Sequence, residues 1–206
     1  MKLYDYTTAP NPRRVRVFLA EKGIEIERVS VDIMAQEHKT PEFIAKNLNG
    51  QIPVLELDDG DCISESVSIC RYLEALHPTP TMFGETPLEV AKIDMHLRRI
   101  ELQLGRSIGV SWVNGPVVAK MAAGRFEQIP AAKTQADAAT HAYYKRLDGE
   151  LAERAMIAGS RYSIVDISAM CLIDFAATLV GLTPAEDLVN IARWRSEVAS
   201  RPSAKA

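Results

Sequence analysis

Residues 49–76 read NGQIPVLELDDGDCISESVSICRYLEAL, and this stretch decides the fold that the sequence predicts. Its apolar start is typical of a short strand, and residues 58–61, DDGD, have the composition of a tight turn. Cys62 and Ile63 then form a second brief strand, so the stretch predicts an antiparallel hairpin. From Glu65-Ser66 onward the apolar residues recur at helical spacing, which predicts a helix up to residue 76.

Pro53 is the unusual residue of the first strand, because a proline cannot donate a hydrogen bond to a sheet. A cis Ile52-Pro53 peptide bond would turn the preceding backbone outward. The N–H and C=O of Ile52 would then pair with the backbone of a bound ligand, as an added strand does. Glu65 and Ser66 present oxygens and N–H groups at a helix start. The stretch therefore predicts a ligand site.

Residues 51–55 (QIPVL), Asp59-Gly60 and Glu65-Ser66 resemble, at this spacing, the glutathione-binding signature of the glutathione S-transferases. The resemblance implies that Ile52, before a cis Pro53, pairs with the cysteinyl backbone of glutathione, and that Glu65 and Ser66 hold its γ-glutamyl end. A purely structural interpretation stays open, with Ile52-Pro53 as a strand entry and Glu65-Ser66 as a helix cap. Residues 37–60 resemble most the bacterial and fungal members of the family.

His38 lies where several family members use a His or Lys to hold the glycine carboxylate of glutathione, and Lys39 is a second candidate for that role. A solvated surface histidine is the other interpretation of His38. The co-substrate that the resemblance implies is thus glutathione, with no metal.

The elements before this stretch follow the thioredoxin-like order. Residues 2–6 predict a strand, and Asn11-Pro12 predicts a helix start, with Asn11 as N-cap and Pro12 as the first helical residue. That helix ends at Lys22-Gly23. Residues 24–32 predict a second, parallel strand, and Thr40-Pro41 starts another helix. Together with the hairpin and its helix, this is βαβ–α–ββα.

The remainder of the chain predicts helices alone, at 88–113, at 130–155 and from Ser163 onward. Ser163 and Asp166 have the spacing of a capping box, which in the family starts a central buried helix. Residues 77–86, HPTPTMFGET, predict a linker. The predicted fold class is α+β: a thioredoxin-like glutathione-binding domain at 1–76, the linker at 77–86, and an all-helical domain at 87–206 that carries the electrophile pocket and dimer contacts.

Composition excludes several other classes of protein. A net charge of −3 and a pI near 5.9 argue against a nucleic-acid binder, which would be expected to be basic. Cys62, Cys70 and Cys171 are odd in number and far apart, which favours reduced thiols over disulfides or a zinc site. No apolar stretch approaches the length of a membrane span. We expect a cytoplasmic protein whose partners are small molecules and a second copy of itself.

The chemistry depends on the thiol of glutathione, whose pKa must fall by about two units, or about 3 kcal/mol, to give a thiolate at neutral pH. The field of a helix N-terminus supplies about 0.3–1 kcal/mol, up to ~2 when partly buried. A hydrogen bond to a charged acceptor adds about 1.5–3 kcal/mol. A donor is therefore needed at the start of the first helix, where most classes have Tyr, Ser or Cys. Here the serine position falls on Pro10.

We favour Asn11 as this donor, with the helix N-terminus behind it, and a purely capping role for Asn11 stays open. Other candidates are Thr7, Thr8, Tyr4, Tyr6 and a water held by Ser107 or Ser111. Ser107, Ser111 and Trp112 are also candidates for the electrophile pocket, with Met121. Arg98 and Arg99 are possible charge partners across a dimer interface, whereas His77, His96 and His141 are interpreted as surface or structural residues.

Three functions fit these residues. The first is conjugation of the glutathione thiolate to small hydrophobic electrophiles, a detoxification reaction. The second is a glutathione-dependent disulfide reductase or isomerase; a maleylacetoacetate isomerase is disfavoured because the serine-rich loop is missing. The third is a non-catalytic module that keeps the fold for dimerisation or ligand carriage. Against the third stands the full set of ligand groups that converges on one predicted cleft.

Overall fold

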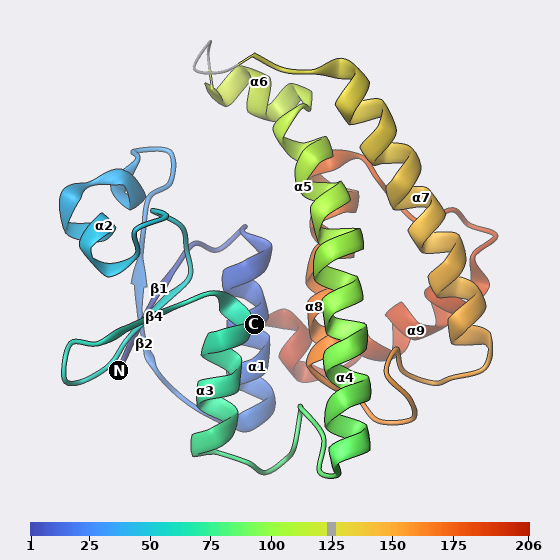
Figure 1. Ribbon diagram of the computed structural model, residues 1–206, viewed down its shortest axis with the longest axis horizontal. Coiled ribbons are helices and arrows are strands. Elements are labelled where there is room, and N and C mark those ends of the chain that lie inside the picture. The colour runs from blue at the N-terminus through green and yellow to red at the C-terminus, as the bar shows by residue number, and fades with distance from the viewer. Residues whose placement is uncertain (123–126) are drawn as a thin grey trace. The chain divides into compact units, whose positions relative to one another are not determined.

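The computed structural model describes residues 1–122 and 127–206 (Figure 1). These residues divide into two compact units, the first made of 1–82 with 202–206 and the second of 83–201. Residues 77–86, the expected linker, contain neither helix nor strand.

The described part of the first unit holds a four-stranded sheet in the order β2-β1-β3-β4. Its strands are β1 (Lys2–Asp5), β2 (Glu27–Ser30), β3 (Val54–Glu56) and β4 (Cys62–Ser64). β1 pairs in parallel with β2 and antiparallel with β3, and β4 is antiparallel to β3. The helices are α1 (Pro10–Lys22), α2 (Pro41–Lys46) and α3 (Ser66–Leu76), with the 3₁₀ turns η1 (Glu37–Lys39) and η4 (Pro202–Lys205). The predicted thioredoxin-like βαβ–α–ββα order is confirmed.

The two faces of the sheet are covered differently because side chains alternate along each strand. Tyr4 and its partner Val54 face a cluster that includes Phe43 of α2, whose ring lies 5.8 Å from that of Tyr4. The neighbouring pair Leu3 and Leu55, which is fully buried, faces the other side. There α1 and α3 lie side by side (Figure 1). This packing brings the starts of α1 and α3 into one region.

Helix α1 begins earlier than predicted. Its first residue is Pro10 and its N-cap is Ala9, which makes no side-chain capping bond, so the prediction that Asn11 caps this helix is wrong. Pro10 is suited to the first helical position because its fixed φ matches the helix and its missing N–H would have had no partner there. Asn11 is consequently the second helical residue, and its side chain is released from capping. The predicted end is confirmed, since Gly23 has a φ of 63°.

Strand β2 is shorter than the predicted 24–32 because its partner is short. β1 has four residues, and they pair in register with Glu27–Ser30. Of the apolar residues outside this stretch, Val31 makes one last bond to β1, from its N–H to the Asp5 carbonyl at 2.9 Å, and Ile24 and Ile26 precede the paired residues. The helix start at Thr40 is as predicted: its hydroxyl accepts a hydrogen bond from the N–H of Phe43.

The second unit is helical throughout its described residues. The predicted helix at 88–113 is a continuous run of α4 (Pro87–Arg99), the π-helical η2 (Ile100–Gly105) and α5 (Arg106–Val113). After it come α6 (Pro116–Ala122), α7 (Pro130–Ala152), α8 (Ile164–Phe175), the π-helical η3 (Ala176–Val180) and α9 (Val189–Ala199). α5 and α7 lie side by side (Figure 1). None of the helices in the described residues is both long and apolar enough to cross a membrane.

The capping box that starts α8 is confirmed. The Ser163 N–H donates to Asp166 Oδ2 at 3.0 Å, and the Ser163 hydroxyl accepts from the N–H of Val165 at 3.3 Å. Asp166 Oδ1 also accepts from the Ile157 N–H at 3.0 Å and from Trp194 Nε1 at 2.9 Å. Through these bonds the carboxylate of Asp166, which is fully buried, connects the loop before α8, the start of α8 and helix α9.

Candidate functional site

The loop that enters β3 carries the first group of predicted site residues. The Ile52-Pro53 peptide bond is cis, as predicted. The paired register of β3 begins one residue later, where Val54 lies opposite Tyr4 on one side and Ser64 on the other. Ile52 is half-buried and precedes the residues of β3 that pair with β1 and β4.

Internal hydrogen bonds hold this loop in place. The side-chain amide of Asn47, which is buried, donates to the Gln51 carbonyl at 2.7 Å. Lys39 Nζ donates to the carbonyls of Asn49 and Gly50 at 3.2 and 3.0 Å. The ammonium group of Lys39 therefore fixes the loop before Ile52, whatever else it contacts.

His38 lies in η1, immediately before this lysine. A Cβ atom at Gly50 would stand 2.7 Å from the His38 carbonyl oxygen, so η1 and the loop approach each other more closely than any other residue would allow. His38 is half-buried, and its Nδ1 atom is buried without a hydrogen-bond partner in the described structure. Burial, and then the charge of Lys39, lower the pKa of His38 below its ordinary value. The ring is therefore neutral at neutral pH, and one of its nitrogens is enclosed by the protein without a hydrogen-bond partner.

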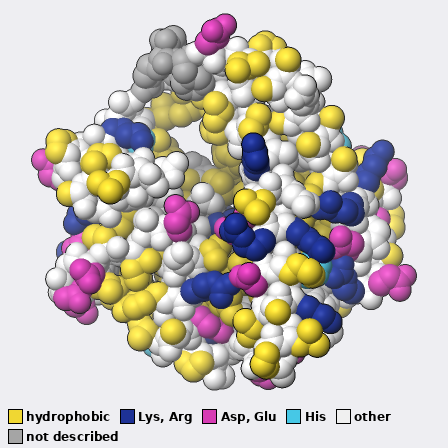
Figure 2. All heavy atoms as spheres, in the orientation of Figure 1, with side chains coloured by type: hydrophobic (Ala, Val, Ile, Leu, Met, Phe, Trp, Pro, Cys, Tyr) yellow, Lys and Arg dark blue, Asp and Glu magenta, His cyan; other side chains and the backbone are white. Residues whose placement is uncertain are grey.

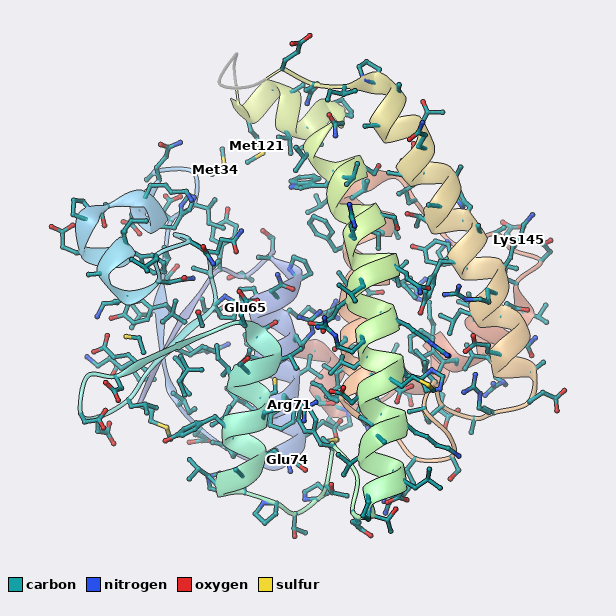
Figure 3. The ribbon with its side chains drawn as sticks, in the orientation of Figure 1. Met34, Glu65, Arg71, Glu74, Met121 and Lys145 are labelled. Atoms are coloured by element: carbon teal, nitrogen blue, oxygen red, sulfur yellow. The ribbon has the colours of Figure 1, made fainter. Side chains whose placement is uncertain are left out.

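The start of α3 carries the second group, Glu65 and Ser66. Glu65 has a φ of 63° and a ψ of 112°, and its side chain makes no capping bond, so it does not serve as an ordinary side-chain cap. Its carboxylate is exposed at the head of α3 (Figure 3). A non-glycine residue in this conformation costs about 1–3 kcal/mol, and such residues gather at functional sites. Ser66, by contrast, is buried.

A buried arginine joins the starts of the two helices. Arg14 Nη1 donates to the side-chain oxygen of Asn11 at 3.0 Å and to the hydroxyl of Ser66 at 2.5 Å. Arg14 is only 3% exposed, and its Nε has no partner in the described structure. Sequence reasoning did not assign Arg14 to the site. The available signal was its spacing, since a residue three positions after Asn11 lies on the same face of a helix.

Comparison with known proteins identifies the family. Residues 1–75 match the family described as "Glutathione S-transferase, N-terminal domain", and residues 116–202 match "Glutathione S-transferase, C-terminal domain". The "Glutathione S-transferase 2" of Saccharomyces cerevisiae is 37% identical, over 100% of this chain and 88% of that protein. The chain belongs to the glutathione S-transferase family.

Structural likeness agrees with this assignment. The crystal structure of Gtt2 from Saccharomyces cerevisiae superposes with a TM-score of 0.92 at 35% identity, covering 100% of this chain and 99% of that one. A more partial relative is a "Maleylacetoacetate isomerase" of Pseudomonas aeruginosa, 35% identical over 45% of this chain and 44% of that protein. Relatives in this family thus include proteins named for different reactions.

The hydroxyl groups that were the other candidates near the start of α1 are either bonded within the protein or exposed. The Tyr4 hydroxyl donates to Glu56 Oε2 at 2.8 Å, and burial, followed by that contact, raises the pKa of Tyr4. Thr7 and Thr8 are exposed. The Thr7 carbonyl accepts from Arg16 Nη2 at 2.8 Å, which holds the loop before α1.

The candidate serines of the second unit are engaged in its internal packing. Ser107 donates to the Leu104 carbonyl at 2.9 Å and accepts from the Thr140 hydroxyl at 2.8 Å. Ser111 is fully buried and donates to Asp137 Oδ1 at 2.5 Å. The bonds to Thr140 and Asp137 join α5 to α7. Lining of the electrophile pocket by Ser107 and Ser111 stays a prediction.

The remaining candidates of the second unit also have defined contacts. The ring of Trp112 packs edge-on against that of Phe175, with 5.1 Å between the centroids. His96 is buried against Arg154 Nη1 at 3.1 Å, and burial, followed by that charge, lowers the pKa of His96. Arg98 forms an ion pair with Glu101 at 3.3 Å. Over residues 1–122 and 127–206, no group of three or more His, Cys, Asp and Glu side chains is arranged to hold a metal ion.

Proposed function

We propose that this protein conjugates the thiolate of glutathione to small hydrophobic electrophiles. The observation that carries the proposal is the link that Arg14 makes between the starts of α1 and α3. Two helix N-termini and a buried cation meet there, and backbone N–H groups at helix starts favour anions. Glutathione, the ligand of the family, carries two carboxylates and an acidic thiol.

Each predicted residue has a distinct role in this proposal. The backbone of Ile52, before Pro53, pairs with the cysteinyl part of glutathione. Glu65 binds the γ-glutamyl ammonium, and Ser66 with the first N–H groups of α3 binds the neighbouring carboxylate. This division follows from charge, since an exposed carboxylate attracts the ammonium and a helix N-terminus attracts the carboxylate.

The glycine carboxylate is assigned to His38. Its buried Nδ1 lacks a partner, whereas the ammonium of Lys39 already donates to two loop carbonyls. Lys39 then contributes its positive charge and holds the loop in shape. His38 would supply the directed hydrogen bond.

Asn11 is the proposed donor to the thiolate. It is exposed at the second position of α1, so its own position lies in the positive field of the helix start. The thiol loses its proton to water, and the amide N–H stabilises the sulfur anion. The sulfur then forms a bond to an electrophilic carbon, and either a leaving anion departs or the adduct takes a proton from water.

We further propose that the protein is a cytoplasmic homodimer. Cys62, Cys70 and Cys171 are thiols that form no disulfide in the described structure, as expected in a reducing compartment. Leu88, Met95 and Leu102 are exposed at intervals of seven residues along α4 and η2, and this spacing places them on one helical face. Such an exposed apolar face is typical of an interface between copies.

The test is a conjugation assay with glutathione and a chlorodinitrobenzene, run beside a reduction assay with a small organic disulfide. We expect conjugation by the parent protein and its loss in Glu65→Gln/Ser66→Ala, with the far-ultraviolet circular dichroism of the folded parent retained. Disulfide reduction without conjugation would instead establish the reductase. Glutathione binding by calorimetry without either reaction would establish the non-catalytic module.

A further inference from the structure

We propose that Arg14 is a positioning residue that turns Asn11 and Ser66 into outward-facing hydrogen-bond donors for glutathione. This inference rests on the proposed function and adds a residue to that site. It assigns Arg14 no contact with the ligand. Its effect passes through the two side chains that it binds.

The inference follows from the donor count of a guanidinium group. Arginine has N–H donors and no acceptor, so any group bonded to it must present an acceptor on that side. Nη1 carries two hydrogens, and its two contacts are Asn11 Oδ1 and Ser66 Oγ. Both hydrogens are thereby used.

For Asn11 the consequence is a fixed amide orientation. Because Oδ1 faces Arg14, the NH₂ group must point the other way. Asn11 is exposed, and its NH₂ group donates to no protein acceptor in residues 1–122 and 127–206. An asparagine that was free to flip would present its oxygen to an approaching thiolate for part of the time. Arg14 excludes that orientation.

For Ser66 the consequence is that its hydroxyl hydrogen must point away from Arg14. A serine oxygen whose lone pair accepts from Arg14 can donate its own hydrogen in another direction. No protein acceptor takes that hydrogen within the described ranges. The hydroxyl is therefore free to donate to a carboxylate at the start of α3.

The charge of Arg14 supports the same conclusion. Arg16, two residues further along α1, is also buried, and it is paired with Asp5 at 2.5 Å. Arg14 has no such carboxylate partner among the described residues, and its Nε is unbonded. A buried cation without a counter-ion is unfavourable, so a bound anion nearby would stabilise it. The free protein is thus arranged for an anionic ligand.

The decisive variant is Asn11→Asp. An aspartate keeps the bond to Arg14, makes it charge-assisted and suits a helix start, so the protein should fold as stably as the parent. It has no N–H to offer outward. We expect the thiol pKa of bound glutathione, read from its ultraviolet thiolate absorbance, to rise by at least about one unit relative to the parent.

Arg14 itself is tested by Arg14→Lys and Arg14→Gln, with Arg13→Gln as the matched control. Arg13 is the preceding residue of α1, carries the same charge and contacts the Ala204 carbonyl, outside the site. We expect Arg14→Gln to raise the thiol pKa of bound glutathione and to weaken its binding by roughly tenfold or more. Arg14→Lys keeps the charge, so both changes should have the same direction but be smaller. Arg13→Gln should resemble the parent.

The outcomes separate this inference from the proposed function. A parent protein that binds no glutathione overturns both. Binding and thiolate formation in the parent, with unchanged values in folded Asn11→Asp and Arg14→Gln, overturn only the role of Arg14. If the Arg14 variants do not fold, the side-chain amide of Asn11 in the ¹⁵N-labelled parent decides: nuclear Overhauser effects from its NH₂ hydrogens to the cysteinyl CH₂ of bound glutathione support the orientation set by Arg14, and effects from those hydrogens to the Arg14 guanidinium overturn it.

Discussion

Glu65 has a backbone conformation that only glycine adopts without strain, and this permits a test of its role. Glu65→Gly and Glu65→Ala both remove the carboxylate, but only glycine relieves the positive φ of 63°. We expect the glycine variant to be more stable than the alanine variant by about 1 kcal/mol in denaturant unfolding. Both should lose glutathione binding. Equal stability of the two would show that the conformation carries no strain.

The assignment of His38 predicts a pH dependence of ligand binding. In the free protein, burial and Lys39 lower the pKa of His38, so its ring is neutral at neutral pH. A bound carboxylate favours the charged ring and raises this pKa. The affinity should therefore be greatest at acid pH and fall as the pH rises through the raised pKa of the complex.

The measurement uses S-methylglutathione, whose thiol cannot ionise, in calorimetry between about pH 5 and 8, where histidine titrates. His38→Gln serves as the control and should bind without this dependence. The same slope in parent and variant would assign the glycine carboxylate to another group, with Lys39 the next candidate.

The residues of the site could be predicted where they lie close together in the sequence. Ile52-Pro53 and Glu65-Ser66 lie in one short stretch, and the structure confirms the cis bond and the helix start. Arg14 was not predictable in the same way. Its bond to Ser66 joins positions 52 residues apart, and a helical pattern shows which face a residue occupies but not what lies opposite.

At the scale of elements, the start of α8 is the clearest case of a local pattern with a long-range effect. Ser163→Ala removes one capping acceptor and should lower the free energy of unfolding by about 1 kcal/mol. Asp166→Ala should cost considerably more, because it leaves the N–H groups of Ser163, Ile157 and Trp194 buried without an acceptor, at about 1–3 kcal/mol each. Denaturant unfolding of the two variants checks this order.

Element boundaries were less predictable than element types. Pro10 and Pro12 both suit the first turn of a helix, and the preference of Asn11 for capping favoured the later start, which is wrong. Strand β2 ended early because the length of β1, not its own apolar pattern, limited the pairing. Neither a capping preference nor an apolar pattern predicted the π-helical segments η2 and η3. Each of these outcomes depends on a neighbour in space.

At the scale of the whole molecule, the fold class could be predicted because several features of the sequence indicated the same fold. Strand alternation, turn residues, glycine and proline positions and the order of elements all predicted a thioredoxin-like unit and a helical unit, and both are present. The electrophile pocket did not follow in the same way. Ser107 and Ser111 lie on one helix, as expected; their hydroxyls bond to Thr140 and Asp137 of α7, and that of Ser107 also to Leu104 of η2, so their lining of the pocket stays a prediction.

The exposed face of the second unit allows a test of assembly. Figure 2 shows hydrophobic side chains beside gathered Lys and Arg side chains over the α4–η2 run and α7. Leu88, Met95 and Leu102 are 65%, 41% and 56% exposed, which is costly for three apolar residues on one face unless a partner covers them. We expect the parent protein to sediment as a dimer.

Met95→Glu/Leu102→Glu should sediment as a monomer, because two copies would bury these charges without counter-ions, which is strongly unfavourable. Val189→Glu is the matched control: Val189 is an equally apolar residue, 64% exposed on another helix, α9, and the variant should remain dimeric. Sedimentation velocity at several protein concentrations distinguishes the states. A dimeric double variant would place the interface elsewhere, and a monomeric parent would refute the homodimer. If the monomer still binds glutathione in calorimetry, the ligand groups of Ile52, Glu65 and Ser66 act within one chain, as their position in a single compact unit predicts.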